Sequence, residues 1–357
     1  MATWEKKKML RENGEYVDMQ VPVIVSASRS TDIPAFYADW FFHRLDVSGY
    51  SAWTNPFNGV RSYISYQNTR FVVFWSKNPW PLLDNLHILE RRKIGCYIQY
   101  SLNDYEAEGL EKRVPPLEQR IDTFKRLVER LGKGHVIWRF DPLVLTDHIS
   151  IDSLIAKIEN IGDQLHGYTE KLVFSFVDIL EYSKVRNNLR TIHINYHDWT
   201  DSQMREFAQK LAILNKKWGY ELATCGEKID LTEFGVKKNR CIDDELIIRL
   251  AYHDKVLMDY LGFEIHDMPQ PDLFGNTEQP SEDAIILPDG KYAVRSGKRS
   301  NQDKGQRQFC GCIKSKDIGE YNTCIHGCEY CYANASKERA LENYKKHLMD
   351  KTKESIT

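Results

Sequence analysis

Seven short apolar runs in the first 240 residues predict the strands of a parallel sheet. The runs are rich in β-branched and aromatic residues and are nearly continuous in apolar character, which is typical of strands that are covered by helices. They are residues 22–28, 50–54, 70–76, 93–101, 135–140, 171–177 and 220–225.

Amphipathic stretches lie between most of these runs and predict helices. They are residues 79–92, with Asn78 as the N-cap; 117–131, ended by Gly132; and 201–218, opened by a capping box of Thr200 and Gln203. The repeated alternation of strand and helix favours an α/β fold with a parallel (β/α) barrel or partial barrel. A doubly wound open sheet is the alternative.

The alternation stops after residue 242. Residues 243–261 predict one more helix, and the Pro- and Gly-containing stretch 263–309 predicts an ordered irregular excursion. Residues 336–350 predict a helix that docks on the body, with residues 351–357 frayed. We therefore expect one structural unit in three parts: residues 1–242 as the barrel-like core, 243–309 as the helix and excursion, and 310–357 as the cysteine-rich loop and C-terminal helix.

Composition and charge indicate a cytoplasmic protein. Hydrophobic residues make up 42% of the 357 residues, which is enough to bury a sizeable core. No apolar run approaches the roughly 20 residues that span a bilayer, and the charged N-terminal stretch has no apolar segment typical of a signal peptide. The net charge of −2 gives no general reason to expect nucleic-acid binding, although a local basic cleft is not excluded.

The cysteines are concentrated near the end of the chain, where five of the eight lie within residues 310–331. In a reducing compartment such crowding favours metal ligation or catalysis over disulfides. The core of the motif is Cys324-x3-Cys328-x2-Cys331, with Gly327 able to take the positive φ of a tight loop. Three thiolates on one loop can ligate three irons of a [4Fe–4S] cluster and leave the fourth iron to an external chelator such as S-adenosylmethionine.

Three segments also carry a resemblance to known families. CIHGCEYCYA (324–333) resembles the cluster loop of the radical S-adenosylmethionine superfamily, Cys-x3-Cys-x-aromatic-Cys, and its YCYA ending resembles relatives of spore photoproduct lyase. Together with VSASRSTDIP and WRFDPL, the segment from Cys310 to Asn334 resembles, over residues 25–334, a bacterial family described as a domain of unknown function.

The superfamily resemblance implies an enzyme that cleaves S-adenosylmethionine to a 5′-deoxyadenosyl radical. The radical would modify, rearrange or repair a substrate that the sequence does not identify. Cys324, Cys328 and Cys331 would hold the cluster, and Tyr330 would lie beside the adenine. An electron donor such as flavodoxin or ferredoxin would be a partner.

The position of the loop departs from the superfamily pattern. In most members the loop follows the first barrel strand, whereas here it follows all seven candidate strands. A circular permutation of the barrel accounts for this order, with the helix at 336–350 taking the part of the first helix.

Other metal assignments remain open from the sequence. Cys310 and Cys312 with two later cysteines, or with His326, could hold structural zinc, and the chain could be a non-catalytic binding module or an electron-transfer protein. A second set of cysteines consists of Cys225, Cys241, Cys310 and Cys312. This set could hold a second [4Fe–4S] cluster, a zinc ion or no metal. Cys96 is predicted to be a buried core thiol.

Polar residues gather at the predicted C-terminal ends of the strands, where barrel enzymes place their chemistry. Arg29 or Arg139 could grip the methionyl carboxylate, and Asp141 could hold the ribose hydroxyls, so these three are the catalytic and cofactor-binding candidates. Caps, turns and ion pairs are the alternative roles for each of them. The other strand-end residues are Ser28, Asp32, Thr54, Asn55, Ser76, Lys77, Asn78, Ser101, Asn103, Asp178 and Glu227.

Overall fold

The centre of the computed structural model is an eight-stranded sheet in which every neighbouring pair of strands is parallel. The structure describes residues 4–55, 58–270, 279–297, 301–303, 305 and 309–357. The strand order is β13-β12-β10-β8-β7-β6-β3-β17. These strands are β3 (Ile24–Ala27), β6 (Phe71–Ser76), β7 (Gly95–Ser101), β8 (Val136–Leu143), β10 (Lys171–Phe176), β12 (Glu221–Thr224), β13 (Lys237–Lys238) and β17 (Lys316–Asp317).

The sheet curves into an arc whose ends do not meet. Within the described part of the chain, β13 and β17 each pair on one side only, which is consistent with a partial α/β barrel. Six of the seven predicted strands lie in this sheet, so the predicted α/β class with a parallel sheet is confirmed.

The run at 50–54 is a strand, but its assignment to the parallel sheet is wrong. It forms β4 (Tyr50–Thr54), which pairs antiparallel with β5 (Arg61–Ser65). The connection between them is too short for a parallel crossover, which takes about a dozen residues or more. Both belong to a separate sheet with the order β1-β2-β5-β4, in which β1 is Lys6–Leu10 and β2 is Tyr16–Gln20.

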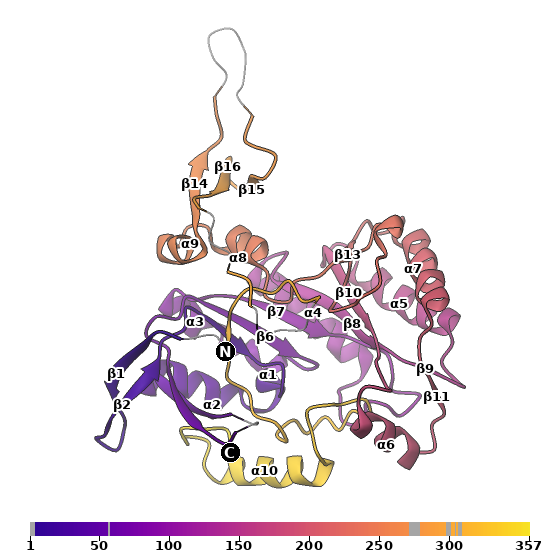
Figure 1. Cartoon of the computed structure of the whole chain (residues 1–357), viewed down its shortest axis with the longest axis horizontal. Helices are drawn as coiled ribbons and strands as arrows, with labels where there is room; N and C mark the ends of the chain where they lie inside the picture. Colours follow the sequence, from indigo (N-terminus) through magenta and orange to yellow (C-terminus); the bar gives the residue numbers. More distant parts are fainter. Residues whose placement is uncertain (1–3, 56–57, 271–278, 298–300, 304, 306–308) are drawn as a thin grey trace.

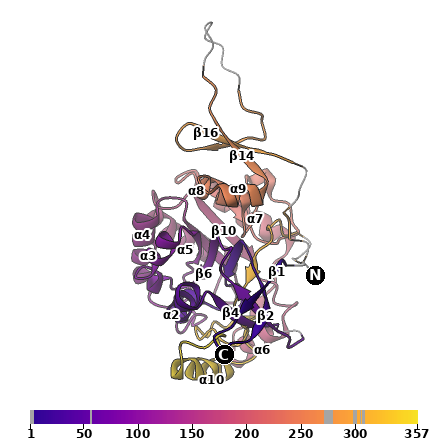
Figure 2. The same ribbon diagram turned by 90° about the vertical axis from the view of Figure 1, so that its left-hand side faces the viewer.

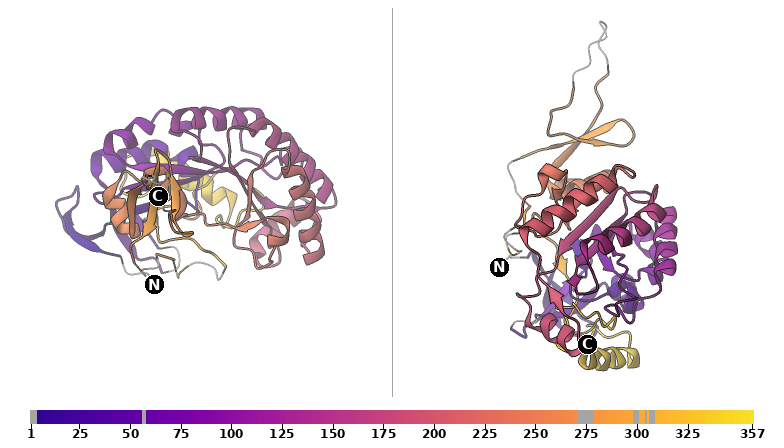
Figure 3. Two further views of the ribbon diagram at one scale, coloured as in Figure 1. Left: turned by 90° about the horizontal axis from the view of Figure 1, so that it is seen from above. Right: turned by 90° about the vertical axis from the view of Figure 1, so that its right-hand side faces the viewer.

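Helices cover the outer side of the arc, as the view from above shows (Figure 3). Alternate strand residues such as Val72, Ile98 and Trp138 pack against them in one large core. None of the helices in the described ranges has the length and apolar character to cross a membrane. The α-helices up to residue 215 are α1 (Ile33–Phe36), α2 (Ala38–His43), α3 (Leu86–Arg92), α4 (Leu117–Leu131), α5 (Ile151–Leu165), α6 (Ser183–Thr191) and α7 (Asp201–Asn215).

One predicted helix has the observed bounds, one ends earlier than predicted, and one starts later. Helix α4 has the predicted bounds, and α7 begins at the predicted capping box of Thr200 and Gln203 but ends at Asn215, before the predicted residue 218. The helix predicted at 79–92 begins only at Leu86, after a 3-10 turn. In a helix that began earlier, the Pro81 carbonyl would accept from the backbone N–H of Asn85. Here the Asn85 side chain donates to that carbonyl instead, which favours a later helix start.

The inner face of the arc changes from apolar to polar along the strands. Near the strand starts, Ile24, Phe71 and Tyr97 pack on α8 (Asp244–Ala251) and α9 (Lys255–Leu261). These are two helices and not the single one predicted at 243–261, because Asp254 caps a new helix by accepting from the Leu257 amide. The polar residues at the carboxyl ends of the strands are left to form the candidate functional site.

The predicted irregular excursion contains a small antiparallel sheet, which projects as an arm in Figures 1 and 2. Its strands are β14 (Phe263–Asp267), β15 (Ile285–Leu287) and β16 (Lys291–Arg295), and part of the predicted stretch lies outside the described residues. Asp289 and Gly290 both have positive φ, as a tight hairpin turn requires. A further two-stranded pair joins β9 (Leu145–Thr146) to β11 (Tyr196–His197).

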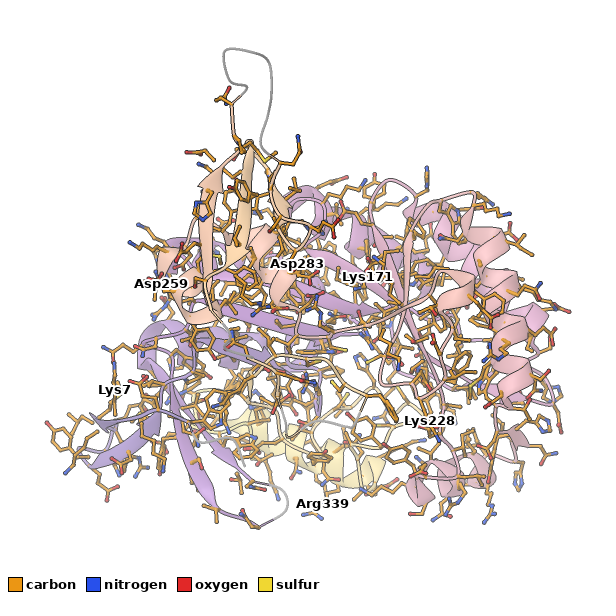
Figure 4. The ribbon with its side chains drawn as sticks, turned by 45° about the horizontal axis from the view of Figure 1, so that its top comes forward. Lys7, Lys171, Lys228, Asp259, Asp283 and Arg339 are labelled. Carbon is orange, nitrogen blue, oxygen red and sulfur yellow. The ribbon has the colours of Figure 1, made fainter. Side chains whose placement is uncertain are left out.

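The C-terminal helix α10 (Lys337–Met349) docks as predicted, through ring contacts of Tyr344 with Phe36 and Tyr37. Figure 4 labels Asp259 on α9 and Arg339 on α10, and Figure 1 shows these two helices on opposite sides of the central sheet. The prediction of a frayed tail at 351–357 is wrong. Ile356 is fully buried, and the Glu354 carbonyl accepts from the backbone N–H of Ala52 on β4 at 2.7 Å.

Replacing Gly319 with alanine is expected to lower the free energy of unfolding by about 1–3 kcal/mol, the usual cost of overpacking. Gly319 follows β17, and a Cβ atom there would overlap Ser28 Oγ and lie 2.5 Å from Ser28 Cβ. Urea unfolding would measure the effect. Gly297→Ala is the matched control, since its Cβ would meet no atom within 4 Å among the residues that the structure describes. Equal unfolding midpoints for the two variants would contradict the close packing of Gly319 against Ser28.

Candidate metal and cofactor site

One cavity of about 430 Å³ lies at the carboxyl ends of the parallel strands. Its wall includes inward-facing strand residues such as Trp75, Arg139 and Ser175. Cys96 is 4% exposed within the outer core. The other seven cysteines line the cavity: a first cysteine group of Cys324, Cys328 and Cys331, and a second cysteine group of Cys225, Cys241, Cys310 and Cys312.

The first cysteine group lies on the loop between β17 and α10, and none of its thiols forms a disulfide. Gly327 has φ of 70°, as expected for a glycine that lets the loop turn. The Tyr37 hydroxyl donates to the Thr323 carbonyl at 2.7 Å, and the Asn334 amide donates to the Cys324 carbonyl at 2.7 Å. The first bond holds the loop against the body, and the second joins the two ends of the cysteine segment.

Two other residues of the loop, His326 and Glu329, have side chains that can ligate metals, and both are held elsewhere. His326 Nε2 lies 2.7 Å from Asp32 Oδ2 in a buried pair, and His326 Nδ1 lies 3.2 Å from the Arg113 carbonyl oxygen. The buried Glu329 carboxylate forms ion pairs with two more exposed lysines, Lys337 at 2.6 Å and Lys112 at 3.3 Å. His326 also lines the cavity, but its ring is paired with Asp32, so the candidate metal ligands that the loop presents to the cavity are the three thiols.

Asp32 anchors the loop from the end of β3. Its carboxylate accepts hydrogen bonds from the Ser76 hydroxyl and the Lys77 amide, both at 2.7 Å, in addition to the contact with His326. Burial alone raises the pKa of Asp32, but the hydrogen bond with His326 and the other donors bring it below its ordinary value. The carboxylate is thus charged at neutral pH.

Tyr330, between the last two loop cysteines, is 9% exposed and lines the cavity. Its hydroxyl donates to Glu111, and Asn103 donates to the Tyr330 hydroxyl at 3.1 Å. Lys77 pairs with Glu111 at 2.7 Å, and its ammonium lies 5.3 Å from the Tyr330 ring centroid. Burial raises the pKa of Glu111, but Lys77 and Arg120 outweigh this and lower it to about 2. The ring is therefore fixed at one edge by a charged network.

The second cysteine group brings together three segments that are distant in sequence. Cys225 Sγ lies 3.1 Å from Cys241 Sγ, and the Cys241 amide donates to Cys312 Sγ at 3.1 Å. Arg139 Nη1 donates to Cys241 Sγ at 3.4 Å. Four thiols thus meet on the cavity wall beside a buried guanidinium.

The predicted cofactor residues Arg29, Arg139 and Asp141 all line the cavity. Arg139 is engaged through Nε and Nη2 with Asp141 and through Nη1 with Gln99 and Cys241. The Arg29 guanidinium packs over the Trp75 ring, 5.2 Å from its centroid. Asp141 also accepts a hydrogen bond from Ser175. The three therefore belong to one polar wall, in which Arg139 is held by its neighbours.

Comparison with family models gives a match to a domain of unknown function, DUF1848, over residues 24–333. The match covers most of the chain. The chain belongs to the DUF1848 family. This match confirms the predicted membership of a family described as a domain of unknown function, over nearly the same residues as predicted. A comparison with curated proteins gave no match, and neither did a comparison with solved structures.

In this DUF1848 chain, most of the predicted strand-end residues gather at the cavity. Those that line it are Ser28, Arg29, Asp32, Ser76, Lys77, Ser101, Arg139, Asp141 and Asp178. Asn103 supports the wall by donating to Tyr330 and to the Asp141 carbonyl. Thr54 ends β4 in the separate sheet and Asn55 follows it, and Glu227 accepts from the Phe176 backbone amide. Asn78 was predicted to be a helix N-cap, but it does not cap a helix. Its backbone N–H donates to Ser76 Oγ.

Asp317 and Ser175 contribute to the site although the sequence analysis did not select them. Asp317 accepts from the hydroxyls of Ser26 and Ser28 and from the Arg29 amide, so it joins β17 to the end of β3. Its strand has two residues and carries no periodic signal. Ser175 points inward from β10, which the strand alternation could have indicated.

No group of three His, Cys, Asp or Glu side chains within the described ranges converges closely enough to hold a single metal ion. Structural zinc takes four ligands around one ion. The side chains of either cysteine group would have to move to form such a site, and His326 would have to leave Asp32.

Proposed function

We propose that the chain is a cytoplasmic radical S-adenosylmethionine enzyme whose first cysteine group holds a [4Fe–4S] cluster through three of its four irons. The observation that carries this is the ligand set of the loop: three thiols line the cavity, while His326 and Glu329 are committed to other partners. Each thiolate of such a cluster binds a different iron, so the three sulfurs do not have to meet at one point.

A circular permutation accounts for the late position of the loop. What supports it is the order of elements at the sheet edge: β17 pairs in parallel with β3 and leads into the cysteine loop and then into α10. In this arrangement β17 takes the place of a first barrel strand and α10 that of a first helix. The loop then lies at the carboxyl end of the sheet, where barrel enzymes carry their active sites.

When bound, the cluster would supply an electron to the sulfonium and so release a 5′-deoxyadenosyl radical. The residues of the chain would bind and orient the cofactor. We assign the methionyl carboxylate to Arg29, since all three nitrogens of Arg139 already have partners. Asp141 would accept from the ribose hydroxyls, and the fixed ring of Tyr330 would pack beside the adenine.

The substrate to be modified, rearranged or repaired is not assigned by these residues. The reducing electron would come from a small donor such as flavodoxin or ferredoxin. Two other functions are outcomes of the same test: a zinc- or cluster-stabilised binding module, and a cluster protein that only transfers electrons.

Anaerobic reconstitution of the full chain with iron and sulfide tests the proposal. We expect a brown protein that forms 5′-deoxyadenosine from S-adenosylmethionine when dithionite is added, measured by chromatography and mass spectrometry. A colourless zinc protein would support a binding module. A brown protein that leaves S-adenosylmethionine intact, and whose spectrum does not respond to it, would support electron transfer alone.

A further inference from the structure

We propose that the second cysteine group, Cys225, Cys241, Cys310 and Cys312, binds a second [4Fe–4S] cluster with a protein thiolate on every iron. The site would hold its cluster whether or not the first cysteine group binds S-adenosylmethionine. It differs from the first group in offering four thiols where the loop offers three.

The fold brings these thiols together from three separate places. Cys225 follows β12, Cys241 lies between β13 and α8, and Cys310 and Cys312 precede β17. The sheet order places β12 and β17 toward opposite edges, and the arc turns both edges toward the cavity. Because residues from both ends of the sheet contribute, a cluster here would also tie the two edges of the open barrel together.

The surroundings of the sulfurs suit bound thiolates. Cys241 Sγ accepts from Arg139 Nη1 and from the Asn239 side-chain amide, both at 3.4 Å. Cys312 Sγ accepts from the backbone amides of Cys241 at 3.1 Å and Ile242 at 3.4 Å. Arg139 and Asn239 are each 3% exposed. Buried donors directed at sulfur stabilise negative charge, and hydrogen bonds to the sulfurs tune the potential of iron–sulfur clusters.

The number of thiols and the space beside them favour a cluster over a disulfide or zinc. Cys225 Sγ and Cys241 Sγ are 3.1 Å apart and form no disulfide, which would require about 2.05 Å. Sulfurs around one zinc ion lie about 3.8 Å apart, from a Zn–S distance of about 2.3 Å, and thiolates on different irons of a cube lie farther apart, so this pair would separate on binding either group. No three ligands of the described chain surround one ion. The adjoining cavity of about 430 Å³ provides room for that separation and for a cube, which a single ion does not need.

Iron, sulfide and zinc contents of four anaerobically prepared full-length proteins test the second site. They are the wild type, the first-group variant Cys324→Ala/Cys328→Ala/Cys331→Ala, the second-group variant Cys310→Ala/Cys312→Ala, and Cys96→Ala as a buried-thiol control outside both groups. We expect about eight irons and eight sulfides in the wild type and the control, and about four of each in both variants.

The first-group variant decides between the outcomes. If it retains about four irons, with a reduced-state electron paramagnetic resonance signal that does not respond to S-adenosylmethionine, the second cluster is supported. If it holds no iron, or one zinc ion in place of iron, the second cluster is overturned. Failure of the proposed function looks different, because the first-group variant would then keep the wild-type iron content while the second-group variant loses iron.

The wild type gives an answer even if a variant fails to fold. Mössbauer quantitation of the reduced wild type should find two clusters, of which one changes when S-adenosylmethionine is added. A single cluster that responds fully to S-adenosylmethionine would overturn the second site.

Discussion

Replacing Cys324, Cys328 and Cys331 together with alanine is expected to abolish 5′-deoxyadenosine formation by the reconstituted protein. Each thiol would hold a different iron, and without them the cavity offers no open iron to the sulfonium cofactor. Since enzymes commonly accelerate reactions by about 10⁶-fold or more, the loss should be at least about a thousandfold, down to the protein-free level. The measurement is product per chain under dithionite, at equal protein concentration.

Cys96→Ala is the control for this variant, because Cys96 is a buried thiol outside the cavity. It should keep wild-type product formation, with only the stability loss of a small core truncation. Retention of wild-type activity by the triple variant would remove the proposed source of the radical. Equal loss of activity in Cys96→Ala would point to a general effect on folding and not to cluster ligation.

Replacing Asp32 with asparagine is expected to lower the free energy of unfolding of the cluster-free chain by about 1–3 kcal/mol, the usual cost of leaving a buried hydrogen-bonding group without its partner. The buried carboxylate accepts from the Ala35 and Lys77 amides, the Ser76 hydroxyl and the His326 ring, and an asparagine amide has one acceptor oxygen where the carboxylate has two. The Asp32 and His326 side chains are 6% and 2% exposed and lie 2.7 Å apart. Urea unfolding followed by circular dichroism measures the change.

The chain offers a matched control in a second His–Asp pair. His197 Nε2 also lies 2.7 Å from Asp147 Oδ1, but the two side chains are 54% and 46% exposed. Solvent screens such a pair, so Asp147→Asn should leave the unfolding midpoint close to that of the wild type. If both asparagine variants shift the midpoint equally, burial is not what gives the Asp32–His326 pair its strength, and the proposed anchoring of the loop is wrong.

Local patterns predicted much of the framework. The apolar runs at 70–76 and 93–101 became β6 and β7, since a continuous apolar strand can be satisfied only inside a covered parallel sheet. Helix α4 has the predicted bounds because its apolar spacing and Gly132 both act within a few residues. The run at 50–54 was misplaced because β-propensity reports a strand and does not report its partner.

The candidate site was predicted in parts, not as a whole. The spacing of Cys324, Cys328 and Cys331 marks a ligand loop by itself, and Arg29, Arg139 and Asp141 follow from their position at strand ends. The contact of Asp32 with His326 could not be predicted, because its partners are separated by most of the chain. The same holds for Asp317, whose strand is two residues long.

The sequence by itself determined the strand–helix alternation, the three-thiol loop and the family, because these depend on neighbours along the chain. Only the tertiary structure decided that both cysteine groups share one cavity, that His326 belongs to Asp32, and that the tail around Ile356 is buried. Such contacts join residues far apart in sequence, and no local propensity or spacing carries information about which distant surfaces will meet.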